Sequence, residues 1–396
     1  MHGADAAGGR AWSSAAARAP PPLPLLAALL AFAPFVRAAW PVHSWATLPA
    51  FFHSSTLNVA VPGAADLAIM ARFAVVTIEK WQGCNSTGAY PGPARDPAAP
   101  VPTQAEATLA TARALRALRP GIAIATWTDS LRVYANRTLN PGMRDLADQA
   151  CVNNQDSPFL EAHPDPFLLR NASGGLAQEQ YCLFHVYDHR SPVVRNFWRD
   201  ACLNMTGTGL IDGCGADASQ QPGSYINGLA PDVSAAWTAG HVQAVADATR
   251  AVAAAGGFVL GKVVEQLGVS TNAVLQVGCT GSNDTVTNLR AAAARARADG
   301  VRYLYECHGD PDEASLAAFL CGAAEDHYFG SGWWYSAAGN FSSMWLPEYE
   351  RPLGAPLADA AYDAASATWS RGFASGTTVS FNARTNAGKI SWASRT

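Results

Sequence analysis

The sequence contains few charged residues and no basic run. Charged residues make up 15% of the 396 residues, hydrophobic residues make up 49%, and the formal net charge is −4. This apolar content is ample for a large core, which excludes a disordered chain. Because the net charge is slightly negative, nothing draws the protein electrostatically to nucleic acid or to anionic membranes.

The motifs of several enzyme classes are also absent. The sequence has no GxGxxG dinucleotide loop, no phosphate-binding loop and no GxSxG nucleophile elbow. These absences argue against nucleotide chemistry and against serine hydrolysis. Zinc binding is a further alternative, but the cysteines and histidines show neither CxxC nor HExxH spacing. We therefore expect neither a metal ion nor an organic cofactor.

The N-terminal 39 residues are typical of a secretory signal. Arg10 and Arg18 precede an apolar stretch at 23–36, and two alanines follow it. The stretch is shorter than the roughly 20 apolar residues that a membrane anchor needs. An uncleaved anchor or a plastid leader is the alternative. We expect cleavage after the signal and a secreted protein without membrane attachment, because no later segment is long and apolar enough to span a bilayer.

Sequons and cysteines also favour export and predict a disulfide-bonded glycoprotein. N-glycosylation sequons begin at Asn85, Asn136, Asn171, Asn204, Asn283 and Asn340. The cysteines are Cys84, Cys151, Cys182, Cys202, Cys214, Cys279, Cys307 and Cys321. An even number of cysteines in an exported chain indicates disulfides. Their spacing does not choose among the many possible pairings.

Short apolar runs alternate with alanine-rich amphipathic runs. The expected strands are 51–54, 73–79, 121–127, 210–217, 258–264, 273–277, 301–306 and 327–330, with 334 as an alternative end of the last strand. The expected helices are 103–118, 193–203, 234–255, 285–299 and 313–325. This alternation predicts a parallel sheet covered by helices. A count near eight favours a closed α/β (β/α)8 TIM barrel over an open Rossmann sheet, although segment 181–187 could replace one strand.

Two parts of the chain depart from this pattern. Segment 129–180 is rich in proline and asparagine, so we expect it to be an excursion on the surface. Near the C-terminus, 377–382 and 389–392 alternate in polarity around a turn at 386–388. This pattern predicts a β-hairpin appended to the barrel. We expect residues 40–396 to form a single domain that includes the hairpin.

Four acidic residues stand at expected strand ends: Glu79, Asp129, Asp217 and Glu306. In a (β/α)8 barrel the C-terminal strand ends surround the active site. Glycoside hydrolysis needs one protonated and one ionised carboxyl group. A bowl with several carboxyl groups supplies both, because burial and mutual repulsion push their pKa values apart. For any one of these acids the alternative is a salt bridge or a helix cap.

Aromatic residues lie near the same strand ends. The candidates are Trp81, Trp127, Trp333 and Trp334. Sugars present CH-rich faces that stack on flat rings, so these side chains are expected to bind substrate. Packing in the core or at the rim is the alternative for each of them.

Three motifs resemble a known family. Asp212-Gly213 to Asp217 matches a "DGxxxD" strand, 188–198 matches a "DxxxPxVRxxW" helix, and 369–376 matches a "WxRxFxxG" segment. Together they resemble hypothetical glycosyl hydrolase family 15, an uncharacterised group of glycoside-hydrolase-like barrels. The resemblance implies a carbohydrate substrate and places Asp217 at the acid of strand four. One departure is that Gly215 and Ala216 stand where related proteins often carry larger residues.

The sequence thus predicts a secreted glycosidase that acts on an extracellular or cell-wall glycan. Asp217 and Glu306 form the expected carboxyl pair, with Glu79 as a substitute for either. The expected substrate-binding residues are Trp81, Trp127, Asp129, Asp212, Trp333 and Trp334, although Asp212 lies near the strand's start and is more typical of a structural residue. The alternative is a catalytically inactive barrel that binds glycan. The separation of the carboxyl groups distinguishes the two, since a pair more than about 10 Å apart excludes hydrolysis. The sugar, the linkage and the oligomeric state are not determined by the sequence.

Overall fold

The computed structural model describes residues 40–394 except 57–58, 81, 83–103, 133–163, 181–183, 220, 263–270, 278–282, 308–311, 332 and 337–340. The expected signal segment, Trp81 and the sequons at Asn85, Asn136 and Asn340 lie outside the described residues. Among the described helices, none is both long enough and apolar enough to cross a membrane.

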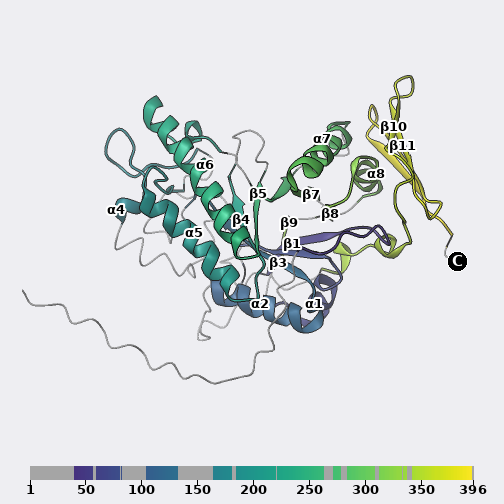
Figure 1. The fold of residues 1–396 in the computed structure, drawn as a ribbon, viewed down its shortest axis with the longest axis horizontal. Coiled ribbons are helices and arrows are strands. Elements are labelled where there is room, and N and C mark those ends of the chain that lie inside the picture. Colours follow the sequence, from purple (N-terminus) through teal and green to yellow (C-terminus); the bar gives the residue numbers. More distant parts are fainter. Residues whose placement is uncertain are drawn as a thin grey trace, which may run out of the picture. The chain divides into compact units, whose positions relative to one another are not determined.

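Eight parallel strands form the sheet at the centre of the molecule (Figure 1). They are β1 (Phe51–Thr56), β2 (Val75–Ile78), β3 (Ala123–Asp129), β4 (Gly213–Asp217), β5 (Phe258–Lys262), β6 (Ala273–Val277), β7 (Arg302–Cys307) and β8 (His327–Ser331). Each of these strands pairs with the next along the chain, in the order β1 to β8. The expected strands are confirmed with small shifts of their ends.

The last strand brings the sheet back to the first. A short strand β9 (Trp333–Ser336) directly follows β8 and pairs in parallel with β1. One step earlier, the Phe329 amide donates to the Pro49 carbonyl oxygen at 2.8 Å, beside a bridge between Ala50 and Phe329. β8 and β9 thus connect β7 to β1 and nearly close the sheet into a barrel. The predicted (β/α)8 class is confirmed.

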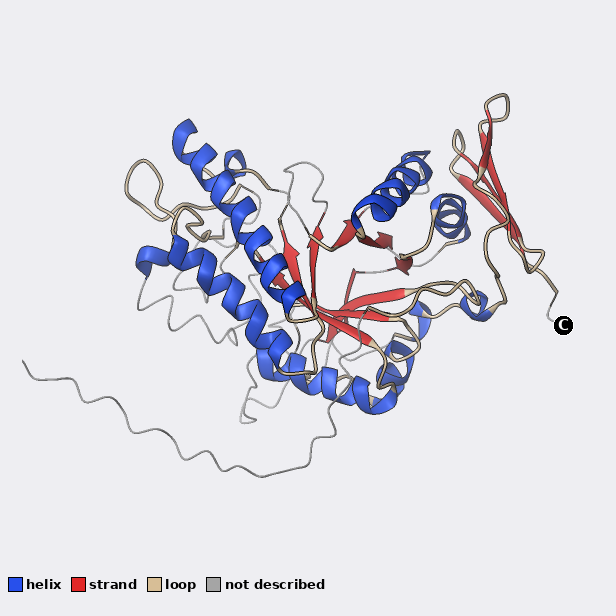
Figure 2. Ribbon diagram, viewed as in Figure 1, coloured by secondary structure: helices blue, strands red, loops and turns tan. Residues whose placement is uncertain are grey.

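Helices cover the outside of this barrel (Figure 2). They are α1 (Ala64–Met70), α2 (Gln104–Leu118), α5 (Pro192–Gly207), α6 (Pro231–Ala254), α7 (Asn283–Asp299) and α8 (Glu313–Gly322). All but α1 were expected from the sequence. Their apolar faces pack on the outward residues of the strands, such as Val76 and Ile124. One disulfide, Cys202–Cys214, joins α5 to β4, and Cys307 is also disulfide-bonded. Cys321 is free and buried.

Segment 164–191 is not part of the barrel. It contains the short helix α4 (Pro164–Phe167) and isolated antiparallel bridges, including Arg132 to Val186 and Leu168 to Tyr187. The predicted excursion therefore has its own local pairing, and the extended residues near 185 belong to it rather than to the barrel. Its apolar side chains, with Leu131 and Trp237, form a small core beside the C-terminal ends of β3 and β4.

The inside of the barrel is apolar and tightly filled. Phe51, Trp127, Phe258 and Tyr328 belong to one buried cluster that is formed by alternate residues of the strands. β4 contributes glycines to this layer, because a Cβ at Gly215 would overlap the ring of Trp127. The departure seen at Gly215 thus has a physical reason, since the position is occupied by an aromatic ring from β3.

A four-stranded antiparallel sheet follows the barrel. Its strands are β10 (Ala361–Asp363), β11 (Thr368–Gly372), β12 (Thr378–Asn382) and β13 (Ala387–Ser391), in that order. The expected hairpin corresponds to β12 and β13, and the two preceding strands extend it into a sheet. Phe381 and Ile390 join the main core cluster, and Gly388 lies against the backbone of α8 at Ala314. The sheet therefore packs on the barrel's last helix.

Candidate active site

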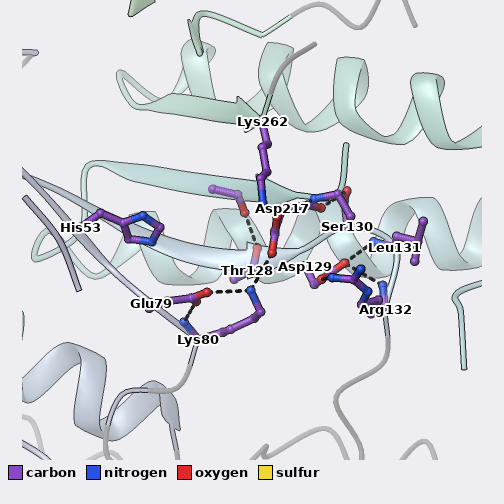
Figure 3. A network of polar contacts seen from close by, with 12 residues as sticks. His53, Glu79, Lys80, Thr128, Asp129, Ser130, Leu131, Arg132, Asp217 and Lys262 are labelled. Atoms are coloured by element: carbon purple, nitrogen blue, oxygen red, sulfur yellow. Dashed lines mark hydrogen bonds and ion pairs between the residues drawn. The ribbon is translucent and has the colours of Figure 1, made fainter. Parts of the chain in front are cut away.

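Successive side chains of a strand point to opposite faces, so every second residue of each strand points toward the barrel axis, and several of these residues are charged. One step above the apolar layer, at the C-terminal ends of the strands, lie His53, Glu79, Asp129, Asp217, Lys262 and Glu306. Each stands two residues after an inward-facing residue, as Asp217 does after Gly215 and Glu306 after Leu304. Figure 3 shows several of these side chains converging, together with Lys80. The expected acidic bowl is therefore also rich in cations.

Asp217 is held by two lysines. Its Oδ2 lies 2.8 Å from Lys80 Nζ and its Oδ1 lies 3.1 Å from Lys262 Nζ. The Ala218 amide also donates to Oδ1 at 2.8 Å. Burial by itself would raise the pKa of Asp217, but Lys80, Lys262 and Arg132 together hold that pKa well below its usual range. Asp217 is thus the ionised carboxylate of the site.

Glu79 shares the Lys80 ammonium group with Asp217. Lys80 Nζ lies 2.7 Å from Glu79 Oε1 and 2.8 Å from Asp217 Oδ2. The two carboxyl oxygens are therefore at most 5.5 Å apart, the sum of these two distances. Glu79 is 0% exposed, and this burial raises its pKa despite the opposing electrostatic effects of Lys80 and His53. The environment pushes the pKa values of two neighbouring carboxyl groups in opposite directions.

Glu306 faces a histidine that sequence reasoning did not single out. Glu306 Oε2 lies 2.7 Å from His53 Nδ1 on β1, and both residues are buried. The His53 ring also contacts Trp127 edge-on, with the ring centroids 5.3 Å apart. One sequence signal could have identified His53: it stands two residues after Phe51, so it points to the same inward side of its strand as Phe51 does.

Asp129 organises the turn that follows β3. Its Oδ1 accepts hydrogen bonds from the amides of Leu131 and Arg132, and its Oδ2 lies 3.6 Å from the Arg132 guanidinium. Burial raises the pKa of Asp129, and Arg132 partly offsets this effect. Arg132 Nε in turn lies 3.5 Å from Glu179 Oε1. Glu179 is fully buried, so this ion pair attaches the excursion to the rim of the bowl.

Two other predicted residues lie outside the charged cluster. Asp212 stands just before β4, at the opposite end from Asp217, where its Oδ2 pairs with Arg116 at 2.5 Å and accepts from the Ile124 amide. This position supports the structural reading of Asp212 and does not bring it near the bowl. Trp127 is 1% exposed and forms the layer beneath the charges. Trp333 pairs with His53 in the sheet register.

Trp334 pairs with Ser54 in the same register. The side chains of Trp333 and Trp334 lie outside the described part, so their expected role in stacking stays a prediction. Among the described residues, no group of three or more histidine, cysteine, aspartate or glutamate side chains could hold a metal ion.

A comparison with protein-family models decides which family this barrel comes from. Residues 116–377 match the model of hypothetical glycosyl hydrolase family 15, about two thirds of the chain. The protein belongs to this family. The match confirms the resemblance carried by the three motifs. It includes Asp217, Lys262 and Glu306 and begins after Glu79, so the family match does not cover β1 and β2.

Solved structures with similar folds include glycoside hydrolases. The glycoside hydrolase domain of PelA from Pseudomonas aeruginosa is 13% identical, with 72% of this chain and 93% of that chain covered and a TM-score of 0.42. The maltogenic α-amylase AmyB from Thermotoga neapolitana is 11% identical, with 85% and 86% covered and a TM-score of 0.47. A search of curated proteins finds no match.

Proposed function

We propose that the protein is a glycoside hydrolase in which Asp217 is the ionised carboxylate and Glu79 the protonated one. The observation that carries the proposal is the pair itself. Two carboxyl oxygens within 5.5 Å of each other, at the C-terminal end of the barrel, belong to groups whose pKa values are shifted in opposite directions. Pairs of this kind perform acid and nucleophile chemistry on glycosidic bonds.

The geometry favours a double displacement. Retaining enzymes keep their carboxyl groups about 5–5.5 Å apart, whereas inverting enzymes keep them about 6.5–9.5 Å apart. Glu79 would donate its proton to the glycosidic oxygen while Asp217 attacks the anomeric carbon, so the C–O bond to the leaving group breaks as an ester to Asp217 forms. Glu79, now ionised, would then take a proton from the water that hydrolyses this ester.

Lys80 has a defined part in this reaction. Its ammonium group lies between the two carboxyl oxygens and favours the ionised form of Asp217. An entering glycosidic oxygen would take the place of Lys80 Nζ beside Glu79. Because Lys262 also contacts Asp217, the charge of the nucleophile stays balanced after that exchange.

The proposed substrate is an extracellular or cell-wall glycan, and the proposed location is outside the cell. The N-terminal signal pattern and the sequons support secretion. The Cys202–Cys214 disulfide is typical of an oxidising compartment. Of the sequon asparagines, Asn204 is exposed on α5 and Asn171 is half-buried in a turn, so both lie at the surface.

A second candidate function is a glycan-binding barrel without catalysis. The observation that favours it is the pairing of the acids. Asp217 contacts two lysines, and Glu306 contacts His53. A bowl in which the charges already balance could recognise sugar hydroxyl groups without cleaving a bond.

The test compares secreted wild-type protein with Asp217→Asn, Glu79→Gln and Glu306→Gln on a broad glycan panel, scored by new reducing ends. Release by the wild type that Asp217→Asn and Glu79→Gln both lose would support the proposed pair. Loss in Asp217→Asn and Glu306→Gln, with Glu79→Gln active, would replace Glu79 by Glu306. No release by any protein, with glycan binding retained by all four, would favour the silent barrel.

A further inference from the structure

His53 combines three features on one buried ring. Its Nδ1 lies 2.7 Å from Glu306 Oε2, its ring edge contacts Trp127, and its exposed fraction is 3%. Its other nitrogen, Nε2, has no hydrogen-bond partner within the described part of the chain. A buried nitrogen without a partner lowers the stability of the folded protein, so natural proteins seldom leave one in a site without a use.

The contact with Glu306 determines what Nε2 can do. An ionised Glu306 carboxylate accepts a hydrogen bond from Nδ1–H, so the neutral ring carries its proton on Nδ1 and presents a lone pair on Nε2. The same contact fixes the angle of the ring, as carboxylate partners of histidines do in metal sites. Glu306 thus affects a group bound at Nε2 indirectly, because it sets the orientation and the tautomer of the His53 ring.

The position of Nε2 relates it to the proposed reaction. His53 lies among the strand-end residues, close enough to Glu79 to influence that carboxyl group electrostatically. Figure 3 shows the His53 ring directed toward the centre of the site, near Glu79. A sugar bound between Glu79 and Asp217 would therefore lie close to the His53 ring.

We propose that His53 Nε2 binds a hydroxyl group of the sugar at the cleavage site and that Glu306 is a positioning residue for His53. This inference rests on the proposed function, because it assumes a carbohydrate between Glu79 and Asp217. It removes Glu306 from the pair of catalytic carboxyl groups. Glu306 Oε2 is committed to His53, and Glu306 itself is 1% exposed, so it reaches the substrate through the ring.

The first test uses four variants: His53→Ala, Glu306→Gln, Glu306→Met and the double variant His53→Ala/Glu306→Met. An amide oxygen can still accept from Nδ1–H, so Glu306→Gln should keep kcat/KM within about threefold of the wild type. Glu306→Met cannot accept this bond, and it should lose about 10- to 100-fold, the same loss as His53→Ala. The double variant should lose no more than either single change, because both remove one function.

His43→Gln is the matched control. His43 is half-buried beside Trp45 and Tyr328, away from the strand-end cluster, so its replacement should leave kcat/KM unchanged. Thermal unfolding of every variant verifies that the folded protein is being assayed. Glu306→Gln as inactive as Asp217→Asn, or losses that multiply in the double variant, would show that Glu306 acts independently of His53 and would overturn the proposal.

The second test needs no turnover. Protein with 15N-labelled histidine rings is titrated with glucose, galactose, mannose, xylose, glucuronate and N-acetylglucosamine while the His53 nitrogens are followed by NMR, assigned with His53→Ala. We expect a protonated Nδ1 and an unprotonated Nε2 in the wild type, and at least one sugar should shift Nε2. The same sugar should shift it less in Glu306→Met.

The two tests separate this inference from the proposed function. Hydrolysis lost in Asp217→Asn, together with an Nε2 that no sugar shifts, would overturn the role of His53 and leave the glycosidase intact. A sugar-dependent shift at Nε2 in a protein that releases no reducing ends would support the His53 site and overturn hydrolysis.

Discussion

The two ends of β4 each bury an aspartate beside a cation, and the difference between them is instructive. At the beginning of the strand, Asp212 pairs with Arg116, whose guanidinium also donates to the carbonyl oxygens of Pro120 and Ile122. Asp212 accepts the Ile124 amide as well. These bonds join α2, β3 and β4. One acid and one cation thus bond to each other and to neighbouring backbone groups, which is typical of a structural ion pair.

At the other end of β4 several charged side chains share partners instead of forming one separate ion pair. Asp217 contacts lysines from β5 and from just after β2, and Glu79 contacts the same Lys80. The partners come from different strands, and the pKa values of the two acids are shifted in opposite directions. Burial, which both aspartates share, therefore does not identify a functional site. Neighbouring acids whose pKa values are shifted in opposite directions are the feature on which the proposed site rests.

The largest expected effect is on activity at the C-terminal end of β4. Asp217→Asn removes the proposed nucleophile and should lower kcat on the order of 10⁴-fold or more, because the amide cannot form the ester intermediate. Steady-state hydrolysis of whichever glycan the wild type cleaves measures the loss. If the separation is that of a retaining enzyme, azide should partly restore turnover in Asp217→Ala as a glycosyl azide. Residual activity close to wild type would remove Asp217 from the mechanism.

The next effect concerns the pH profile. The proposed mechanism requires Asp217 ionised and Glu79 protonated, so kcat/KM should fall on the acid side through the lowered pKa of Asp217 and on the alkaline side through the raised pKa of Glu79. Glu79→Gln should lose about 10²- to 10⁴-fold and the alkaline limb with it. Substrates with a leaving group that needs no proton, such as dinitrophenyl glycosides, should recover most of kcat. An alkaline limb that persists in Glu79→Gln contradicts this assignment.

The comparison predicts the opposite phenotype at the beginning of β4. Asp212→Asn leaves the buried Arg116 without its counter-charge, so it should lower the free energy of unfolding by about 3–5 kcal/mol. The folded fraction should keep its activity, since Asp212 lies far along the strand from the bowl. Urea unfolding measures the first effect. Asp247→Asn, which breaks a partly exposed pair on α6, is the control and should change the unfolding free energy by less than about 1 kcal/mol.

A smaller effect, on stability, is expected from two buried histidines that contact Ser130 beside the C-terminal end of β4. Ser130 Oγ donates to the Asp217 carbonyl oxygen and contacts His241 Nε2 at 2.9 Å, while His189 stacks on His241 and donates from Nε2 to the Ser130 carbonyl oxygen. Burial lowers the pKa of His189 to about 4. The groups that face it are Asp188, Arg195 and His241.

The sign of the pH effect follows from this lowered pKa. The unfolded chain binds a proton below a pH of about 6.5, whereas folded His189 does so only near 4, so stability is lost as the pH falls between these values. The loss should approach about 3 kcal/mol for His189. His189→Gln, whose amide can still donate to Ser130, should flatten this dependence in urea unfolding at pH 7 and pH 4.5. An unchanged slope would show that His189 titrates similarly in both states.

Much of the fold could be predicted because it depends on local periodicity. The strand at 273–277 and the helix at 285–299 were recognisable from short-range pattern alone, and so was the hairpin at 378–391. The strands β10 and β11 were not, because β10 is short and fully exposed and β11 is half-buried apart from the exposed Ser370. They belong to the sheet through pairing with β12, which is a contact that no local pattern contains.

The site divides in the same way. The chain alone determined which acids stand at strand ends, because the alternation in each strand assigns Glu79, Asp217 and Glu306 to one face and one end. Which of them act together depends on closure of the barrel. Closure brings Lys80 between Glu79 and Asp217 and places His53 of β1 against Glu306 of β7, 253 residues away in the chain. Protonation states follow from those distances and from burial, and neither exists before the strands meet.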